Sequence, residues 1–139
     1  MFLDLSKAFD TVDYWLLLQK LTNIGLTTST TQWFNRSCLT NRSQITSIGD
    51  AQYAASNMPV GVPHGSILGR LLFFIYVNDL PDRHLSSDVI LYADDTVIYY
   101  SSKNLSDLED HIDADLGTVS ERFSRNLLTL NISKRNFCN

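Results

Sequence analysis

The amino-acid sequence predicts an α+β domain in which helices pack on one face of an antiparallel sheet. Two runs of strand-forming residues, 88–92 and 96–100, flank a short acidic turn and indicate a β-hairpin. Apolar residues over 105–123 recur at steps of 3 or 4, which is typical of an amphipathic helix. Because strands and helices do not alternate regularly as βαβ units, a mixed architecture is favoured over a parallel sheet.

The first half of the chain contains strand and helix signals in a definite order. The expected elements are a buried strand over 1–5, helices over 14–24 and 30–39, and strands over 44–48 and 51–55. Asp13 is expected to cap the first helix, and Gly25 to end it. Trp15 and Trp33 are predicted to be core residues, with Trp33 anchoring the second helix.

The second half begins with a loop rich in glycine and proline over 61–66. A buried helix over 67–77 follows, and then the hairpin. A capping box that starts at Ser106 predicts the beginning of the long amphipathic helix. The acidic residues along 107–115 are expected to form a mostly solvated face, and a last short strand is expected over 127–132.

Composition indicates one domain spanning residues 1–139, with 44% hydrophobic and 19% charged residues. The longest apolar run, 71–77, is too short for a membrane helix, and the N-terminus lacks a secretory signal. We therefore expect a reduced, intracellular protein, in the nucleus or cytoplasm, that is not secreted. The net charge of −4 argues against a free-standing nucleic-acid binder, which is usually basic.

The acidic turn is the first sign of chemistry. Asp94 and Asp95 are adjacent in a turn without glycine, and Asp4 ends a predicted strand about 90 residues earlier. Carboxylates brought together on a sheet can hold Mg²⁺, and two such ions can promote phosphoryl transfer. Acidic residues at the tip of a loop are also often simply solvated, so spacing alone leaves both interpretations open.

The amino-acid sequences of four segments make the metal-site interpretation more specific. The segments are Phe2-Leu3-Asp4-Leu5-Ser6-Lys7-Ala8-Phe9-Asp10, Gly61-Val62-Pro63-His64-Gly65-Ser66-Ile67-Leu68-Gly69, Tyr92-Ala93-Asp94-Asp95 and Asn126-Leu127-Leu128-Thr129-Leu130-Asn131-Ile132-Ser133-Lys134. In this order they closely resemble the palm motifs of reverse transcriptases from non-LTR (LINE-type) retrotransposons. The resemblance covers nearly the whole chain and implies the palm region of such an enzyme, with incomplete fingers and no thumb.

The resemblance also implies roles for individual residues. The catalytic and metal-binding carboxylates would be Asp4, Asp94 and Asp95, with Asp95 more peripheral. Lys134 matches a lysine that helps to protonate the leaving pyrophosphate. Residues expected to bind substrate are Lys7 and Ala8 at the triphosphate, Phe9 against the sugar 2′-position, and His64 and Gly65 near the nucleotide.

The implied reaction is RNA-directed DNA synthesis, in which a primer 3′-hydroxyl attacks a dNTP along an RNA or DNA template. Two Mg²⁺ ions, or Mn²⁺, would serve as cofactors. Three positions differ from the residues usual in the family: His64 replaces a glutamine, Arg70 a proline and Phe123 a tryptophan. Two alternatives are a catalytically inactive, retrotransposon-derived remnant or binding module, and another two-metal enzyme such as a nucleotide cyclase.

Overall fold

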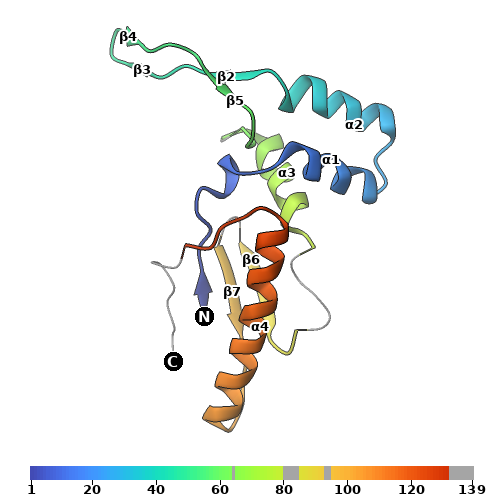
Figure 1. The fold of residues 1–139 in the computed structure, drawn as a ribbon, viewed down its shortest axis with the longest axis vertical. Coiled ribbons are helices and arrows are strands. Elements are labelled where there is room, and N and C mark those ends of the chain that lie inside the picture. The colour runs from blue at the N-terminus through green and yellow to red at the C-terminus, as the bar shows by residue number, and fades with distance from the viewer. Residues whose placement is uncertain (64, 80–84, 93–94, 132–139) are drawn as a thin grey trace.

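The computed structural model describes residues 1–63, 65–79, 85–92 and 95–131. In this part of the chain the main sheet is antiparallel, in the order β1–β7–β6 (Figure 1). Its strands are β1 Phe2–Leu3, β6 Asp88–Tyr92 and β7 Asp95–Tyr99. The central strand pairs Leu3 with Thr96 on one side and Tyr92 with Asp95 on the other. The predicted hairpin is therefore confirmed, with β7 beginning one residue earlier than expected.

The helices lie close to their predicted positions. Their bounds are α1 Tyr14–Asn23, α2 Thr28–Phe34 continued by a π-helical turn Asn35–Leu39, α3 Ile67–Val77, and α4 Leu105–Arg125. Asp13 caps α1 as predicted, because its carboxylate accepts a bond from the Leu16 N–H at 2.9 Å. The prediction that a capping box at Ser106 begins α4 is wrong, because the side chain of Asn104, two residues earlier, caps the helix.

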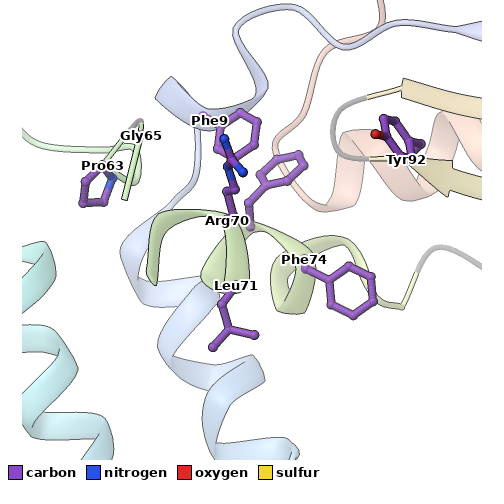
Figure 2. Close-up of a pocket in the computed structure, with 8 residues that line it drawn as sticks. Phe9, Pro63, Gly65, Arg70, Leu71, Phe74 and Tyr92 are labelled. Atoms are coloured by element: carbon purple, nitrogen blue, oxygen red, sulfur yellow. The ribbon is translucent and has the colours of Figure 1, made fainter. Parts of the chain in front are cut away.

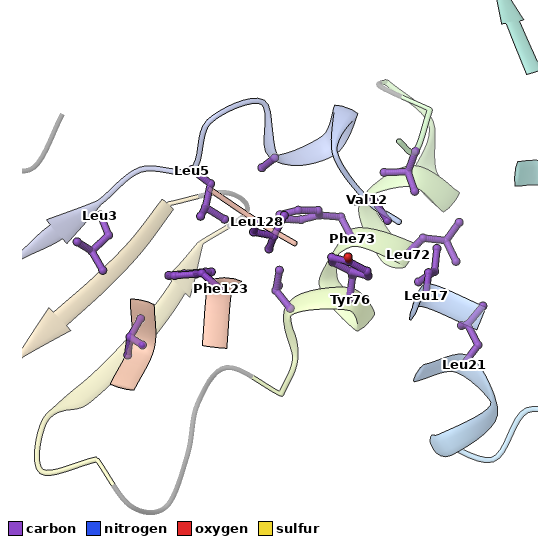
Figure 3. Close-up of a cluster of buried hydrophobic side chains, with 14 of the residues drawn as sticks. Leu3, Leu5, Val12, Leu17, Leu21, Leu72, Phe73, Tyr76, Phe123 and Leu128 are labelled. Atoms are coloured by element: carbon purple, nitrogen blue, oxygen red, sulfur yellow. The ribbon is translucent and has the colours of Figure 1, made fainter. Parts of the chain in front are cut away.

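One hydrophobic core joins the sheet to the helices. Figure 3 shows Leu3 and Leu5 near the N-terminus meeting Phe123 and Leu128, while Phe73 of α3 lies between this group and α1. These side chains are almost fully buried. Helices packed against a small antiparallel sheet confirm the α+β class.

A second pair of short antiparallel ladders forms a long hairpin that projects away from this body (Figure 1). Its strands are β2 Arg42–Gln44 paired with β5 Ser56–Met58, and β3 Ser47–Ile48 paired with β4 Ala51–Gln52. The prediction of two strands around Gly49 is confirmed, although the ladders are interrupted. Their residues are mostly exposed, so no buried face imposes a continuous register.

The prediction that both tryptophans are core residues is wrong, because Trp15 and Trp33 are 68% and 53% exposed. α1 turns Leu17 and Leu21 inward and leaves position 15 outside, and α2 has no buried residue.

The acidic face of α4 is mostly exposed, as predicted. Asp115 departs from this pattern: it is buried and accepts bonds from the backbone N–H groups of Ser86 and Ser87 at 3.2 and 2.6 Å. Its carboxylate thus stabilises the chain just before β6.

The last predicted strand is reduced to a single bridge between Leu130 and Leu5. The chain turns sharply after α4, where Leu127 adopts a left-handed backbone conformation with φ of 54°. The remaining residue of that prediction, Ile132, lies outside the described residues. No described helix is both long enough and apolar enough to cross a membrane.

Candidate active site

Two of the predicted carboxylates meet at one end of the main sheet. Asp4 directly follows Leu3 of β1, and Asp95 opens β7 directly before Thr96, the partner of Leu3. Because the two strands are antiparallel, both acids lie at the same end of this strand pair. Asp4 is half-buried and Asp95 is exposed. Asp94, the third predicted ligand, lies outside the described residues.

Asp4 contacts a residue that the sequence had not singled out. The side-chain amide of Asn131 donates to Asp4 Oδ2 at 2.9 Å, and the Asn131 backbone N–H donates to the Asp4 carbonyl at 2.8 Å. Asn131 belongs to the same motif as Lys134, and that motif was the one signal that could have identified it. Lys134 itself lies outside the described residues.

Phe9 borders a cavity close to the acidic turn. It belongs to a short 3-10 turn, Ala8–Asp10, and stacks on Phe73 of α3 with ring centroids 4.3 Å apart. The cavity has a volume of about 660 Å³ and is lined by Phe9, Pro63, Gly65, Arg70, Leu71, Phe73, Phe74 and Tyr92 (Figure 2). The structure therefore brings the predicted substrate residues Phe9 and Gly65 to one cavity, together with Tyr92 beside the acidic turn.

Lys7 borders a different hollow. This second depression, of about 910 Å³, lies between the 3-10 turn and the projecting hairpin, and Arg42 also lines it. Lys7 is exposed and has a left-handed φ of 50°, whereas Ala8 is buried. Pro63 lines both hollows, so they adjoin at the 61–65 loop. The triphosphate role of Lys7 and Ala8 stays a prediction.

The 61–65 loop is fastened to the segment that carries Phe9. The Val62 N–H donates to the Phe9 carbonyl at 2.8 Å, and the Gly61 N–H donates to the Val12 carbonyl at 2.9 Å. Arg42 Nη1 donates to the Gly61 carbonyl at 2.7 Å. These bonds hold the loop and the aromatic ring in one unit. His64 lies outside the described residues.

A polar junction joins the end of α4 to α1 and α3, with a buried part at Tyr76 and Asn126 and an exposed part at Asp79. The Tyr76 hydroxyl donates to the Asn126 carbonyl at 2.6 Å, and burial raises the pKa of Tyr76 to about 12. Asp79 accepts bonds from Lys20 Nζ at 2.6 Å and from Asn126 Nδ2 at 3.2 Å. These contacts tie α1, α3 and the end of α4 together, just before the chain turns back towards Asp4.

The chemistry of the donors suits a hard cation. Carboxylate oxygens are the ligands that Mg²⁺ prefers, and Asp4 and Asp95 supply them at one sheet end. Among the described residues no three acidic, histidine or cysteine side chains gather into a metal cluster. The described part of the site therefore contributes two of the three predicted ligands.

Comparison with known proteins identifies the family of the chain. Residues 1–139 match the family model described as reverse transcriptase (RNA-dependent DNA polymerase). The chain is 32% identical, over 98% of its length, to a probable RNA-directed DNA polymerase from transposon X-element of Drosophila melanogaster. It is 31% identical, over 81% of its length, to the RNA-directed DNA polymerase from mobile element jockey of the same species.

The chain belongs to the reverse transcriptase family. Its relatives confirm the non-LTR retrotransposon type that the motifs predicted. The chain spans about 15% of the X-element protein and about 13% of the jockey protein.

Proposed function

We propose that this chain forms the palm-type catalytic part of an RNA-directed DNA polymerase that adds a dNTP to a primer 3′-hydroxyl. The observation that supports this most strongly is the register of β1 and β7, which brings Asp4 and Asp95 to one sheet end. The two acids are about 90 positions apart in the sequence, so only the fold unites them. Such convergence of like charges is unfavourable without a cation to neutralise it.

In this proposal Asp4 and Asp94 would hold two Mg²⁺ or Mn²⁺ ions, and Asp95 would have a more peripheral role. The ions would supply positive charge to the reacting phosphate and lower the pKa of the attacking hydroxyl. The chain's own part would be to keep Asp4 and Asp95 in place at the end of the β1–β7 strand pair, so that little reorganisation is needed during the reaction.

Phe9 is proposed to select deoxynucleotides. Its ring lies at the cavity wall and is backed by Phe73, which is buried. A ring held from behind cannot easily move aside for a 2′-hydroxyl, so ribonucleotides would be excluded sterically. Gly65 lines the same cavity, which is consistent with a place near the nucleotide.

Template and primer are proposed to be held partly by fingers and thumb segments of a longer protein. The net charge of −4 supports this, because binding to a phosphate backbone usually relies on clustered basic residues. An intracellular place of action goes with the proposal, since templates and dNTPs are found there.

The test is primer extension by the chain with Mg²⁺, comparing the wild type with Asp4→Ala and Asp113→Ala. Asp113 is an exposed acid on α4 and serves as the matched control. Loss of Asp4 should reduce extension by on the order of 100-fold or more, since a preorganised charge would be removed. Equal activity of all three proteins would contradict the catalytic assignment.

A second comparison addresses the sugar. Phe9→Ala should raise the use of rNTP relative to dNTP, whereas Phe74→Ala, which alters an exposed ring lining the same cavity, should leave the ratio unchanged. Metal binding without any extension by the wild type would favour the inactive remnant. A wild-type preference for ribonucleotides would favour a cyclase-like enzyme.

A further inference from the structure

A short clasp joins the beginning of the chain to the segment after α4. Leu5 and Leu130 form an antiparallel bridge, and the Ser6 N–H donates to the Thr129 carbonyl at 2.8 Å. Beneath the clasp, Leu5 and Leu128 are buried in the core. The backbone next to Asp4 is therefore held by a second segment, independent of β7.

The clasp places the Asn131 amide against the Asp4 carboxylate. An ionised carboxylate only accepts hydrogen bonds, so the amide nitrogen of Asn131 must face it. The distance from Nδ2 to Oδ2 is 2.9 Å, a well-formed bond, and the backbone bond from Asn131 to Asp4 supports it. The same two residues are thus joined both through their side chains and through their backbones.

We infer that Asn131 is a positioning residue that orients the Asp4 carboxylate for metal binding; this inference rests on the proposed two-metal function. A carboxylate has about four lone-pair sites, so the bond from Asn131 restricts its rotation while occupying only one of these sites. The amide is neutral, so it leaves the charge of the site unchanged. A lysine or arginine at this position would orient the carboxylate but would also repel the ion.

The expected effect follows from the behaviour of residues that support metal ligands. Losing such a hydrogen bond typically weakens metal affinity by roughly 10- to 100-fold. The backbone bond from Asn131 to Asp4 does not involve the Asn131 side chain, so the clasp should persist when that side chain is replaced by alanine or leucine. Binding should therefore fall far more than folding stability.

The experiment is a Mn²⁺ titration of the full 139-residue chain, followed by the electron paramagnetic resonance signal of free Mn²⁺. The variants are Asn131→Ala, the similarly shaped Asn131→Leu, Asp4→Ala, and the control Thr129→Ala, whose side chain is exposed on the same segment. Thermal melts without metal, followed by circular dichroism, show whether each variant is folded. Primer extension at rising Mn²⁺ concentration is a second readout.

Both Asn131 variants should bind Mn²⁺ at least several-fold more weakly while melting within a few degrees of the Thr129→Ala protein. Extension should be regained at higher Mn²⁺. Wild-type affinity in Asn131→Leu, alongside loss in Asp4→Ala, would overturn this inference and leave the proposed function standing. Unchanged binding in Asp4→Ala would overturn both.

Discussion

Gly61 combines a left-handed backbone conformation with a close approach to another segment of the chain. Its φ is +90°, and a β-carbon built there would lie 2.9 Å from the Asp10 carbonyl oxygen and 3.0 Å from the Asp10 Cα. Asp10 cannot easily retreat, because its own N–H donates to the Lys7 carbonyl at 2.9 Å. Gly61→Ala should therefore carry two costs, backbone strain and a close contact.

A substitution at Gly25 measures the cost of backbone strain without the cost of a close contact. Gly25 has a similar φ of +96°, but nothing lies within 4 Å of its missing β-carbon. Gly25→Ala should lose only the backbone term, about 1–2 kcal/mol of unfolding free energy. Gly61→Ala should lose about 1–3 kcal/mol more, which is the usual cost of forcing atoms into a packed site.

Urea denaturation followed by far-ultraviolet circular dichroism measures both values, and equal m-values would show that the unfolded states are comparable. In thermal melts the difference should be about 4–12 °C, because a domain of this size shifts by about 4 °C per kcal/mol. If the free energies of Gly61→Ala and Gly25→Ala agreed within about 0.5 kcal/mol, the close approach of the loop to Asp10 would be refuted.

Two further predictions concern buried polar groups. The pKa of Tyr76 in the folded protein is raised to about 12 from an ordinary 10. The contribution of its hydroxyl to the free energy of unfolding is therefore complete below pH 10 and is lost as the pH rises towards 12. Over that range the wild type should lose up to about 3 kcal/mol of unfolding free energy relative to the Tyr76→Phe variant. A Tyr53→Phe variant, changed at an exposed residue, should show the same unfolding free energy as the wild type across this range. Asp115→Asn should cost about 2–3 kcal/mol, because an amide cannot accept from the Ser87 N–H and its neighbour as a carboxylate does. Asp113→Asn, exposed on the same helix, should stay within about 0.5 kcal/mol of the wild type in the same urea assay.

Local signals predicted the helices well. The bounds of α3 agree with the prediction because the Ser66 side chain accepts from the Gly69 N–H and so marks the helix start chemically. Asp13 marks the start of α1 in the same way. The start of α4 was misplaced because Asn104 and Ser106 both offer capping side chains, and the pattern alone did not rank them.

Burial was harder to predict, because it depends on which surfaces meet. The two tryptophans are large aromatic residues, yet they are exposed, while the charged Asp115 is buried. Periodicity places Leu17 and Leu21 on one face of α1, but no local rule says that Trp15 lies beyond its edge.

Part of the candidate site could be predicted from sequence motifs, and part of it depends on contacts between distant segments. The sequence motifs identified Asp4, Phe9 and Gly65. The structure places Asp4 at the same sheet end as Asp95, and Phe9 and Gly65 at one cavity. The contacts that support them were not predictable locally: Asn131 lies 127 positions from Asp4, and Phe73 lies on a helix remote in sequence from Phe9. Such pairs become visible only once the chain is folded.

The clasp also limits when the candidate site can form during synthesis on the ribosome, because its two segments are made at different times. Synthesis proceeds at about 5–20 residues per second, so Asp4 leaves the exit tunnel many seconds before Asn131 is made. During that interval β1 has neither β7 nor the clasp to pair with. The aspartate that would bind metal is thus expected to reach its final orientation only after both partner segments have been made, so a shorter nascent chain would hold the ion poorly.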